Sequence, residues 1–446
     1  MSRVSEDLRQ VVHVTMGAWA IVLRWATWPQ AAALAATALL FNWLVLPRIG
    51  GRSMYRHVDR ARGYPIGILL YPFVVLVLVL IFRQRLDIVA GAWGILAAGD
   101  GFATLVGRRA PVARLPWNAE KSVGGTIAFV VSGTLAGAAL GWFVAGGIGA
   151  AQGLAYWLLV AFAAALASGL VETIPVRLDD NISVAAAAAF VIVCADISSA
   201  ASWSLHAADT WPRIAIGLAL NAAVALAGWM AGTVSRSGVV AGIAIGTIVF
   251  AAAGTGAWIL LLLSFGAAAV TSRIGYKRKL QLGIAEERGG RRGAANAVAN
   301  TGLAAIAAVL AVISPYRAEA LLATAVALIA GSSDTVASEI GKAFGRRTLL
   351  VVGFRPVPPG TSGALSLEGT AAGVAAAALL GLVAVRVGLV PQAMLLIVVI
   401  AATAASLIES ALGATLEAPR VLNNDLLNFV NTAAAAAIAL LLASRL

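Results

Sequence analysis

A succession of long apolar segments runs through almost the whole 446-residue chain, and this feature constrains the fold more than any other. Most of these segments are long enough to cross the roughly 30 Å hydrocarbon core of a bilayer as helices. Hydrophobic residues make up 61% of the sequence and charged residues only 12%, which excludes an ordinary soluble domain. We therefore predict an all-α, polytopic integral membrane protein.

The apolar segments predict about 15 transmembrane helices. They are rich in Ala, Leu, Val and Gly, as expected of helices that pack closely in lipid, and they lack the alternation of a closed β-barrel. We place them near residues 11–27, 29–46, 65–82, 87–107, 122–146, 154–171, 182–200, 212–232, 238–253, 256–272, 294–313, 318–340, 366–385, 391–412 and 426–444.

A carboxylate inside an apolar segment, followed by basic residues and a small-residue turn, occurs twice. The first copy contains Asp100 and the sequence KSVGGT at 121–126, and the second contains Asp334 and the sequence PGTSGALSLEGT at 359–370. Carboxylates in membrane segments are costly and by default mark function. The repetition predicts two related, parallel halves, which we divide at the short polar link 201–211 into residues 1–205 and 206–446.

A third polar element completes each half. Glu172 near the end of one apolar segment precedes the acid and amide cluster at 179–181, and Glu409 similarly precedes the cluster at 423–425. Each half thus offers an Asp, a Gly-Thr turn and a Glu followed by Asp and Asn residues. We expect these elements to form one site in each half.

The distribution of basic residues predicts the orientation in the membrane. The net charge of +12 is compatible with nucleic acid binding, but the basic residues lie in short loops between apolar segments. Most of the Lys and Arg fall in alternate loops, including 48–62 and 273–292, so the positive-inside rule predicts a cytoplasmic N-terminus. Both sites then face the cytoplasm, where nucleotides are found. We expect a bacterial or archaeal cytoplasmic membrane and no nucleic acid partner.

The residue types favour phosphoryl transfer. Oxygen ligands without a His or Cys cluster suit Mg²⁺, which prefers carboxylates and substrate phosphates. Glycines let backbone N–H groups approach phosphate oxygens, and basic side chains neutralise the charge that moves. The sequence has no Walker-type GxxxxGK[ST] motif and no kinase-type GxGxxG motif, so any nucleotide site is of another kind.

The candidate site residues fall into four groups. The candidate catalytic residues are Asp100, Lys121, Glu172, Asp180, Asp334, Glu339, Glu409 and Asp425. The candidate Mg²⁺ ligands are Asp100, Asp179, Asp180, Asp334 and Asp425. The candidate nucleotide and phosphate contacts are Arg108, Arg109, Ser122, Gly125, Thr126, Asn181, Arg291, Arg292, Asn300, Lys342, Gly360, Thr361, Ser362, Gly363, Ser366, Gly369, Thr370 and Asn424. Arg9 and His13 are candidate contacts to the substrate head group.

At these residues each half resembles a family of membrane enzymes. The first half resembles the phytol and dolichol kinases through GDGFA, GRR and EKSVGGT, through LVETIPVRLDDN and through EDLRQVVH at 6–13. Gln10 replaces a usual Lys, and Gly124 replaces the Glu of the dolichol kinases, which favours the phytol kinase branch. The second half resembles the DUF92-type family that includes phytyl-phosphate kinase, through RGGRRGAANAVAN, SSDTVASEIGK and VPPGTSGALSLEGT.

The two resemblances imply a bifunctional, CTP-dependent, Mg²⁺-dependent kinase. The first half would phosphorylate a prenyl alcohol such as phytol, geranylgeraniol or farnesol, and the second would convert the monophosphate to the diphosphate. The alternatives are a cytidylyltransferase that forms a CDP-lipid and a two-repeat transporter, since parallel repeats with charges in the membrane also describe transporters. Chain length and oligomeric state stay open.

Simpler interpretations apply to several of these residues. An isolated membrane Asp can serve helix packing, and the loop Lys and Arg residues can be topology markers only. The turn at 358–363 can be a tight connection. For His13, a phosphate contact and a spectator role are equally compatible with the sequence, and Asp196 is interpreted as structural.

Overall fold

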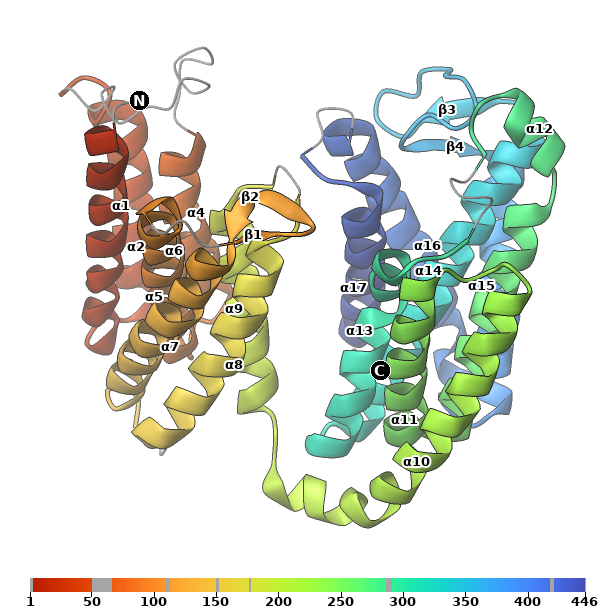
Figure 1. The fold of residues 1–446 in the computed structure, drawn as a ribbon, viewed down its shortest axis with the longest axis horizontal. Helices are drawn as coiled ribbons and strands as arrows, with labels where there is room; N and C mark the ends of the chain where they lie inside the picture. The colour runs from red at the N-terminus through yellow and green to blue at the C-terminus, as the bar shows by residue number, and fades with distance from the viewer. Residues whose placement is uncertain are drawn as a thin grey trace. The chain divides into compact units, whose positions relative to one another are not determined.

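The computed structural model describes residues 3–49, 66–109, 113–149, 152–175, 178–285, 291–417 and 421–445, and side chains from residue 7 onward. The predicted basic loop residues Arg52, Arg56, Arg60, Arg62 and Arg288 lie outside this part. The chain forms two compact units, Met1–Ile197 and Ser198–Leu446, each shown in Figure 1. Each unit is described by itself.

The prediction of an all-α polytopic membrane protein is confirmed. Among the described residues, eleven helices are long and apolar enough to cross a membrane, and Ile66–Ile81 is a shorter apolar helix. The two helices predicted at 238–253 and 256–272 are both present in α11 Arg236–Arg273, and they meet at a break at Gly254, where φ is 85° and the backbone is not helical. Residues 201–211, the predicted polar link, are helical and form the first turns of α10 Ala200–Met230.

The first unit contains eight α-helices and one short hairpin in its described residues. The elements are α1 Arg3–Gly17, the 3-10 helix η1 Ala18–Arg24, α2 Trp28–Leu40, the π-helix η2 Phe41–Val45, α4 Ile66–Ile81, α5 Leu86–Gly94, the π-helix η4 Ile95–Asp100, α6 Gly101–Arg109, β1 Arg114–Leu115, β2 Asn118–Ser122, α7 Val123–Ala145, α8 Leu154–Glu172 and α9 Asp180–Asp196. The antiparallel hairpin β1–β2 immediately precedes α7.

The second unit contains eight α-helices and another short hairpin in its described residues. The elements are α10 Ala200–Met230, α11 Arg236–Arg273, α12 Tyr276–Gln281, α13 Ala294–Ile313, α14 Arg317–Phe344, β3 Thr348–Leu350, β4 Ala364–Ser366, α15 Leu367–Arg386, the 3-10 helix η6 Gln392–Met394, α16 Leu395–Leu412, the π-helix η7 Gly413–Glu417 and α17 Asn424–Ala443. The antiparallel hairpin β3–β4 immediately precedes α15, and α12 lies at the same end of this unit (Figure 1).

Each unit is built around one buried segment that carries the predicted acid. Within the most apolar window of Leu86–Arg109, 72% of residues are buried, and the value for Arg317–Phe344 is 78%, against 11–44% in the other spans. Asp100 ends η4 in the first segment and Asp334 lies in α14, the second. The sequence places the acid on the helix that the other helices surround, where a charged group is most costly.

The two units repeat the same joint between hairpin and helix. Ser122 caps α7 by accepting a hydrogen bond from the N–H of Gly125 at 3.1 Å, and Ser366 caps α15 by accepting one from Gly369, also at 3.1 Å. A Cβ added to Gly125 would lie 3.0 Å from the carbonyl oxygen of Ala103, so α6 and α7 touch through their backbones. Gly369 makes the equivalent close approach to α14. The repeat seen in the sequence is therefore a structural repeat.

Candidate active sites

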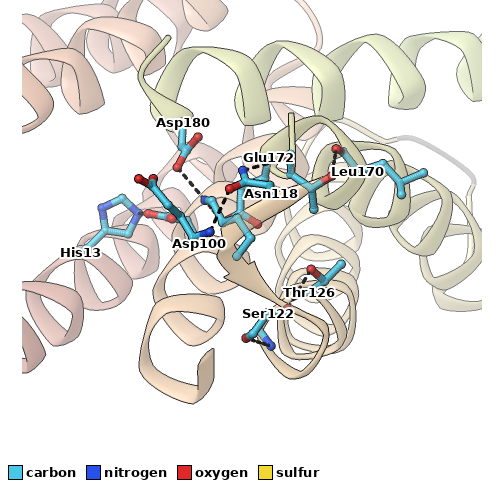
Figure 2. Close-up of polar contacts among 12 residues, drawn as sticks. His13, Asp100, Asn118, Ser122, Thr126, Leu170, Glu172 and Asp180 are labelled. Atoms are coloured by element: carbon cyan, nitrogen blue, oxygen red, sulfur yellow. Dashed lines mark hydrogen bonds and ion pairs between the residues drawn. The ribbon is translucent and has the colours of Figure 1, made fainter. Parts of the chain in front are cut away.

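Three carboxylates converge in the first unit. Asp100 ends η4, Glu172 ends α8 and Asp180 begins α9, and one oxygen atom of each lies within 4.8 Å of the others (Figure 2). In the described part of the chain they are the one group of three acid, His or Cys side chains with this spacing. Glu172 is buried, and Asp100 and Asp180 are partly exposed. The sequence-predicted acids are therefore brought together from three separate segments.

Lys121 joins this carboxylate cluster from the hairpin. Its Nζ lies 2.5 Å from Oε1 of Glu172 and 3.2 Å from Oδ2 of Asp180. Burial lowers the pKa of Lys121, but the two carboxylates outweigh this effect and raise the pKa above its ordinary value. The ammonium group stays charged at neutral pH. It provides a cation beside the acids, as phosphate binding requires.

Lys121 and its neighbour Ser122 have different roles because their side chains lie on opposite faces of the strand. Successive side chains of a strand point to opposite faces, so Lys121 points toward the acids while Ser122 caps α7. The hairpin is fastened to the end of α8, because Trp117 and Asn118 both donate hydrogen bonds to Thr173, at 3.1 Å each. The position of Lys121 is thus fixed at both ends of its strand.

His13 closes the cluster on the α1 side. Its Nε2 lies 3.6 Å from Oδ2 of Asp100, and its ring meets Tyr71 edge to face at a centroid distance of 4.5 Å. The Tyr71 hydroxyl accepts a 2.8 Å hydrogen bond from Nε1 of Trp93. His13 Nε2 is buried and makes no hydrogen bond within the described residues. A buried nitrogen of this kind is poised to bind a polar group that enters the site.

Several other predicted residues of the first unit serve local structure. Asp179 caps α9, its Oδ1 accepting the backbone N–H of Asn181 at 3.0 Å and the Asn181 side-chain amide at 2.6 Å. Thr126 donates a hydrogen bond to the carbonyl of Ser122 at 3.2 Å. Asp179, Asn181, Ser122, Gly125 and Thr126 thus fix the helix starts that carry the cluster.

The predicted arginines lie outside the cluster. Arg108 and Arg109 end α6 and are exposed, and Arg109 donates a 2.7 Å hydrogen bond to Asp7 of α1. Arg9 lies one turn before His13 on α1 and interacts with it electrostatically. Arg109 therefore ties α6 to the helix that carries His13.

A large polar cavity of about 700 Å³ occupies the second unit. Its lining brings together almost all the residues that the sequence predicts for this half. These are Arg291, Arg292, Asp334, Glu339, Lys342, Gly360, Thr361, Ser362, Gly363, Ser366, Gly369, Thr370, Glu409, Asn424 and Asp425. The exception is Asn300, which lines a neighbouring apolar cleft instead.

Asp334 and Glu409 meet in this cavity. Their carboxyl groups interact directly, and Oδ1 of Asp334 also accepts a 2.7 Å hydrogen bond from the hydroxyl of Ser406. Two carboxyl groups in contact at a partly buried position form a site that favours a proton or a cation between them. Ser406 is a site residue that the sequence analysis missed, although it lies one turn before Glu409.

Glu339 is held by two lysines. Lys279 Nζ lies 2.6 Å from its Oε2, and Lys342 Nζ lies 3.0 Å from its Oε1. Lys279 is only 1% exposed and also donates hydrogen bonds to the carbonyls of Ser272 at 2.7 Å and Thr271 at 3.3 Å. The sequence analysis missed Lys279, because nothing in the run YKRKLQ distinguishes it from the basic residues of a loop.

The glycine turn before α15 needs its glycines for backbone reasons. Gly360 and Gly363 have φ of 85° and 73°, a region that other residues rarely adopt. A Cβ on Gly363 would lie 2.3 Å from the carbonyl oxygen of Ser410, so the turn packs directly on α16. Thr361 and Ser362 between them line the polar cavity. The turn is a tight connection and part of the cavity wall at once.

Both sets of acidic side chains have the chemistry that a Mg²⁺ site requires. The three first-unit carboxylates provide the hard oxygen ligands that Mg²⁺ prefers, and their 4.8 Å spacing leaves room for one ion among them. In the second unit Asp334 and Glu409 offer two carboxylates within a cavity large enough for phosphates and water. Both sets are compatible with a divalent cation. Asp179 is oriented as a helix cap, so Asp180 fits the ligand role better.

The fold and these sites define a polytopic membrane protein with two polar sites, each built around a buried acid. The family of integral membrane protein DUF92 matches residues 219–436, which lie within the second unit. An uncharacterized membrane protein of Synechocystis is 38% identical over 44% of this chain and 77% of its own length. The chain therefore belongs to the DUF92 family of integral membrane proteins.

Two plant proteins are also similar to the chain. Protein VTE6 of Arabidopsis thaliana is 33% identical over 47% of this chain, and probable phytol kinase 1 of Oryza sativa is 36% identical over 40% of it. The chain spans 65% of the length of VTE6 and 60% of the length of the rice protein. No solved structure matches the chain.

Proposed function

We propose that the protein is a membrane isoprenoid kinase that adds two phosphates in sequence. The first unit converts a prenyl alcohol to its monophosphate, and the second unit converts the monophosphate to the diphosphate. The donor is CTP, and both sites work with Mg²⁺ from the cytoplasmic face. The similarity to a probable phytol kinase and to the DUF92 family supports the kinase class. The presence of two separate polar sites supports the two steps.

The carboxylate cluster with Lys121 carries the proposal for the first unit. In phosphoryl transfer the protein's main tasks are to position the groups and to neutralise the charge on the moving phosphate. Asp100, Glu172 and Asp180 would hold the cation, which supplies charge neutralisation when bound. Lys121 adds a second positive charge on the same side. His13 binds the alcohol hydroxyl through its free Nε2, next to Asp100.

The 700 Å³ cavity carries the proposal for the second unit. A prenyl monophosphate brings about two negative charges that an alcohol lacks. Arg291, Arg292 and Lys342 line the cavity and can balance them. Asp334 and Glu409 face the same space and would hold the metal. The cavity is large enough for a nucleotide as well, because ligand pockets of about 300–1,000 Å³ are typical for small molecules.

Product analysis tests the proposal. Purified protein in nanodiscs with CTP, Mg²⁺ and geranylgeraniol should yield the monophosphate and then the diphosphate, with two CDP for each diphosphate. The same protein given geranylgeranyl monophosphate should yield the diphosphate and one CDP. Release of pyrophosphate with a CDP-lipid would identify a cytidylyltransferase. No product from either acceptor with CTP, ATP or UTP would leave the transporter as the better interpretation.

A further inference from the structure

An apolar cleft of about 140 Å³ lies beside the polar cavity of the second unit, and most of its lining residues have no role in the sites described above. Four helices form it: α10, α11, α13 and α14. Its polar lining residues are largely satisfied by other groups. The Asn221 amide donates to the carbonyl of Gly217 at 2.8 Å and accepts from Nε1 of Trp258 at 3.0 Å. The interior therefore presents mainly hydrocarbon to whatever enters it.

The cleft continues into the polar cavity. Arg292, Gly293, Asn296 and Thr335 line both of them. The Arg292 guanidinium is held at this junction by 2.9 Å and 3.3 Å hydrogen bonds to Asn296 and to the hydroxyl of Ser272. A molecule that spans the junction would place a charged end beside Arg292 and an apolar part in the cleft. That combination describes a phosphate attached to a hydrocarbon chain.

The glycines of α11 give the direction and the length of the cleft. Gly238 contacts the backbone of Arg292, since a Cβ there would lie 2.3 Å from the Arg292 carbonyl oxygen. Gly242 and Gly246 follow at successive turns and also line the cleft. Eight residues of helix from Gly238 to Gly246 correspond to about 12 Å. The cleft thus runs away from the polar cavity along the helix.

We propose that this cleft binds the part of the acceptor's prenyl chain next to the phosphate, with the phosphate at Arg292. This inference rests on the proposed function of the second unit. An apolar cavity of about 150 Å³ holds one benzene molecule, so a 140 Å³ cleft suits a segment of similar size, about one isoprene unit. The remainder of the chain extends beyond the cleft. The cleft therefore selects the branched, unsaturated segment beside the phosphate and leaves total chain length unrestricted.

Filling the cleft tests the inference. A Cβ on Gly242 would meet no atom within 4 Å, so Gly242→Leu puts a side chain into the open space without a backbone clash. Such a change in an apolar pocket should raise the KM for geranylgeranyl monophosphate about 10- to 100-fold. The kcat at saturation and the alcohol kinase step of the first unit should stay unchanged. Gly242→Ala should give an intermediate KM.

Gly266→Leu is the matched control. Gly266 lies in the second part of α11, beyond the break at Gly254, a Cβ there is equally free of contacts, and it does not line the cleft. It should keep the wild-type KM. If Gly242→Leu also keeps the wild-type KM while wild-type protein phosphorylates the monophosphate, the cleft is not the chain subsite. If wild-type protein does not phosphorylate the monophosphate, the proposed function fails instead.

A binding experiment distinguishes a prenyl chain in the cleft from a membrane lipid in the cleft, and it does not require turnover. A prenyl monophosphate with a diazirine on its first isoprene unit should label peptides from the helices that form the cleft, α10, α11, α13 or α14. Excess unlabelled prenyl monophosphate should prevent this labelling, and phospholipid vesicles should not. Equal competition by phospholipid would assign the cleft to membrane lipid and overturn the inference. Labelling confined to other helices would overturn it too. This experiment uses wild-type protein, so it tests the inference even if Gly242→Leu fails to fold.

Discussion

In the first unit the buried glutamate at the end of α8 faces a lysine, whereas in the second unit the glutamate of α16 faces another carboxyl group. Glu172 pairs with Lys121 at 2.5 Å, and Glu409 interacts with Asp334. Both units place an antiparallel strand pair before the helix, cap that helix with a serine and bring a glycine against the neighbouring helix, although the connection between the strands is short in β1–β2 and long in β3–β4. The joint between strand pair and helix is therefore shared by the two units, whereas the charges next to it differ.

The difference in charge between the two sites arises at one strand position and in the residues around it. Lys121 on β2 corresponds to Leu365 on β4, so the second hairpin offers no cation to its acids. The second unit instead supplies Lys279 and Lys342, and both bind Glu339. Its further basic residues at the cavity, Arg291 and Arg292, come from the segment before α13. We interpret this as a change from a neutral acceptor to a charged one.

Removal of the divalent cation should have the largest effect and should treat both units alike. Without a cation the grouped carboxylates repel the phosphates of the nucleotide, so both phosphorylation steps should fall below detection in excess chelator. Added Mg²⁺ should restore them. The assay is CDP release with alcohol or monophosphate as the acceptor. One step that persists in chelator would show that the two sites differ in metal use.

Substitution of the central acids should separate the two steps. Asp100→Ala should reduce use of free alcohol by roughly 10²–10³-fold or more, because it removes a group that holds transition-state charge. It should leave the conversion of added monophosphate intact. Asp334→Ala should do the reverse, so that monophosphate accumulates. Equal loss of both steps in either variant would mean one composite site and would end the two-kinase proposal.

Replacement of Lys121 by leucine, the residue at the equivalent position of the second hairpin, should affect the first step only. Lys121→Leu removes the cation between Glu172 and Asp180, and we expect a roughly 10²-fold lower kcat for the alcohol step. Arg114→Leu, which removes an exposed cation from the same hairpin outside the carboxylate cluster, is the matched control and should change neither step. The raised pKa of Lys121 also predicts that its charge is lost only at a pH above the ordinary lysine range. Wild-type activity of Lys121→Leu would make this lysine a topology marker only.

Removal of Lys279 should lower stability more than it alters chemistry. The Lys279–Glu339 pair is almost fully buried, and loss of one partner of such a pair costs about 3–5 kcal/mol. Lys342 remains beside Glu339 and should reduce this cost. Lys279→Met should therefore lower the thermal midpoint of the second unit, and Lys279→Met combined with Glu339→Gln should recover part of it. An unchanged midpoint in the single variant would contradict the structural role of the pair.

Cysteine labelling should give the smallest functional effect and tests whether the repeat is parallel in the membrane. In a Cys194→Ser background, cysteines at the exposed positions Arg114 and Val352 should both react from the cytoplasmic side with little loss of activity. Reaction of the two cysteines from opposite sides would make the repeat inverted and would separate the nucleotide sites.

The sequence predicted which residues form the sites better than it predicted the contacts between them. Asp100, Glu172 and Asp180 were predicted because costly acids recurred in both halves, and the structure brings them within 4.8 Å. Lys279 was not predicted, because burial of a lysine depends on a partner on another helix and leaves no mark on its own segment. The two hairpins were also missed. Strands of two to five residues are too short to show a period of their own.

The placement of Lys121 and Ser122 as neighbours on β2 ties a charged site to the start of a membrane helix. One side chain serves the acids and the next serves the cap of α7, so a slip of one residue in the strand would exchange their roles. Insertions and deletions inside this strand therefore disturb site and cap together, and a change of length in the turn at 116–117 does the same, because turn length sets the register of a hairpin. The hairpin thus fixes the distance between the start of α7 and the carboxylate cluster.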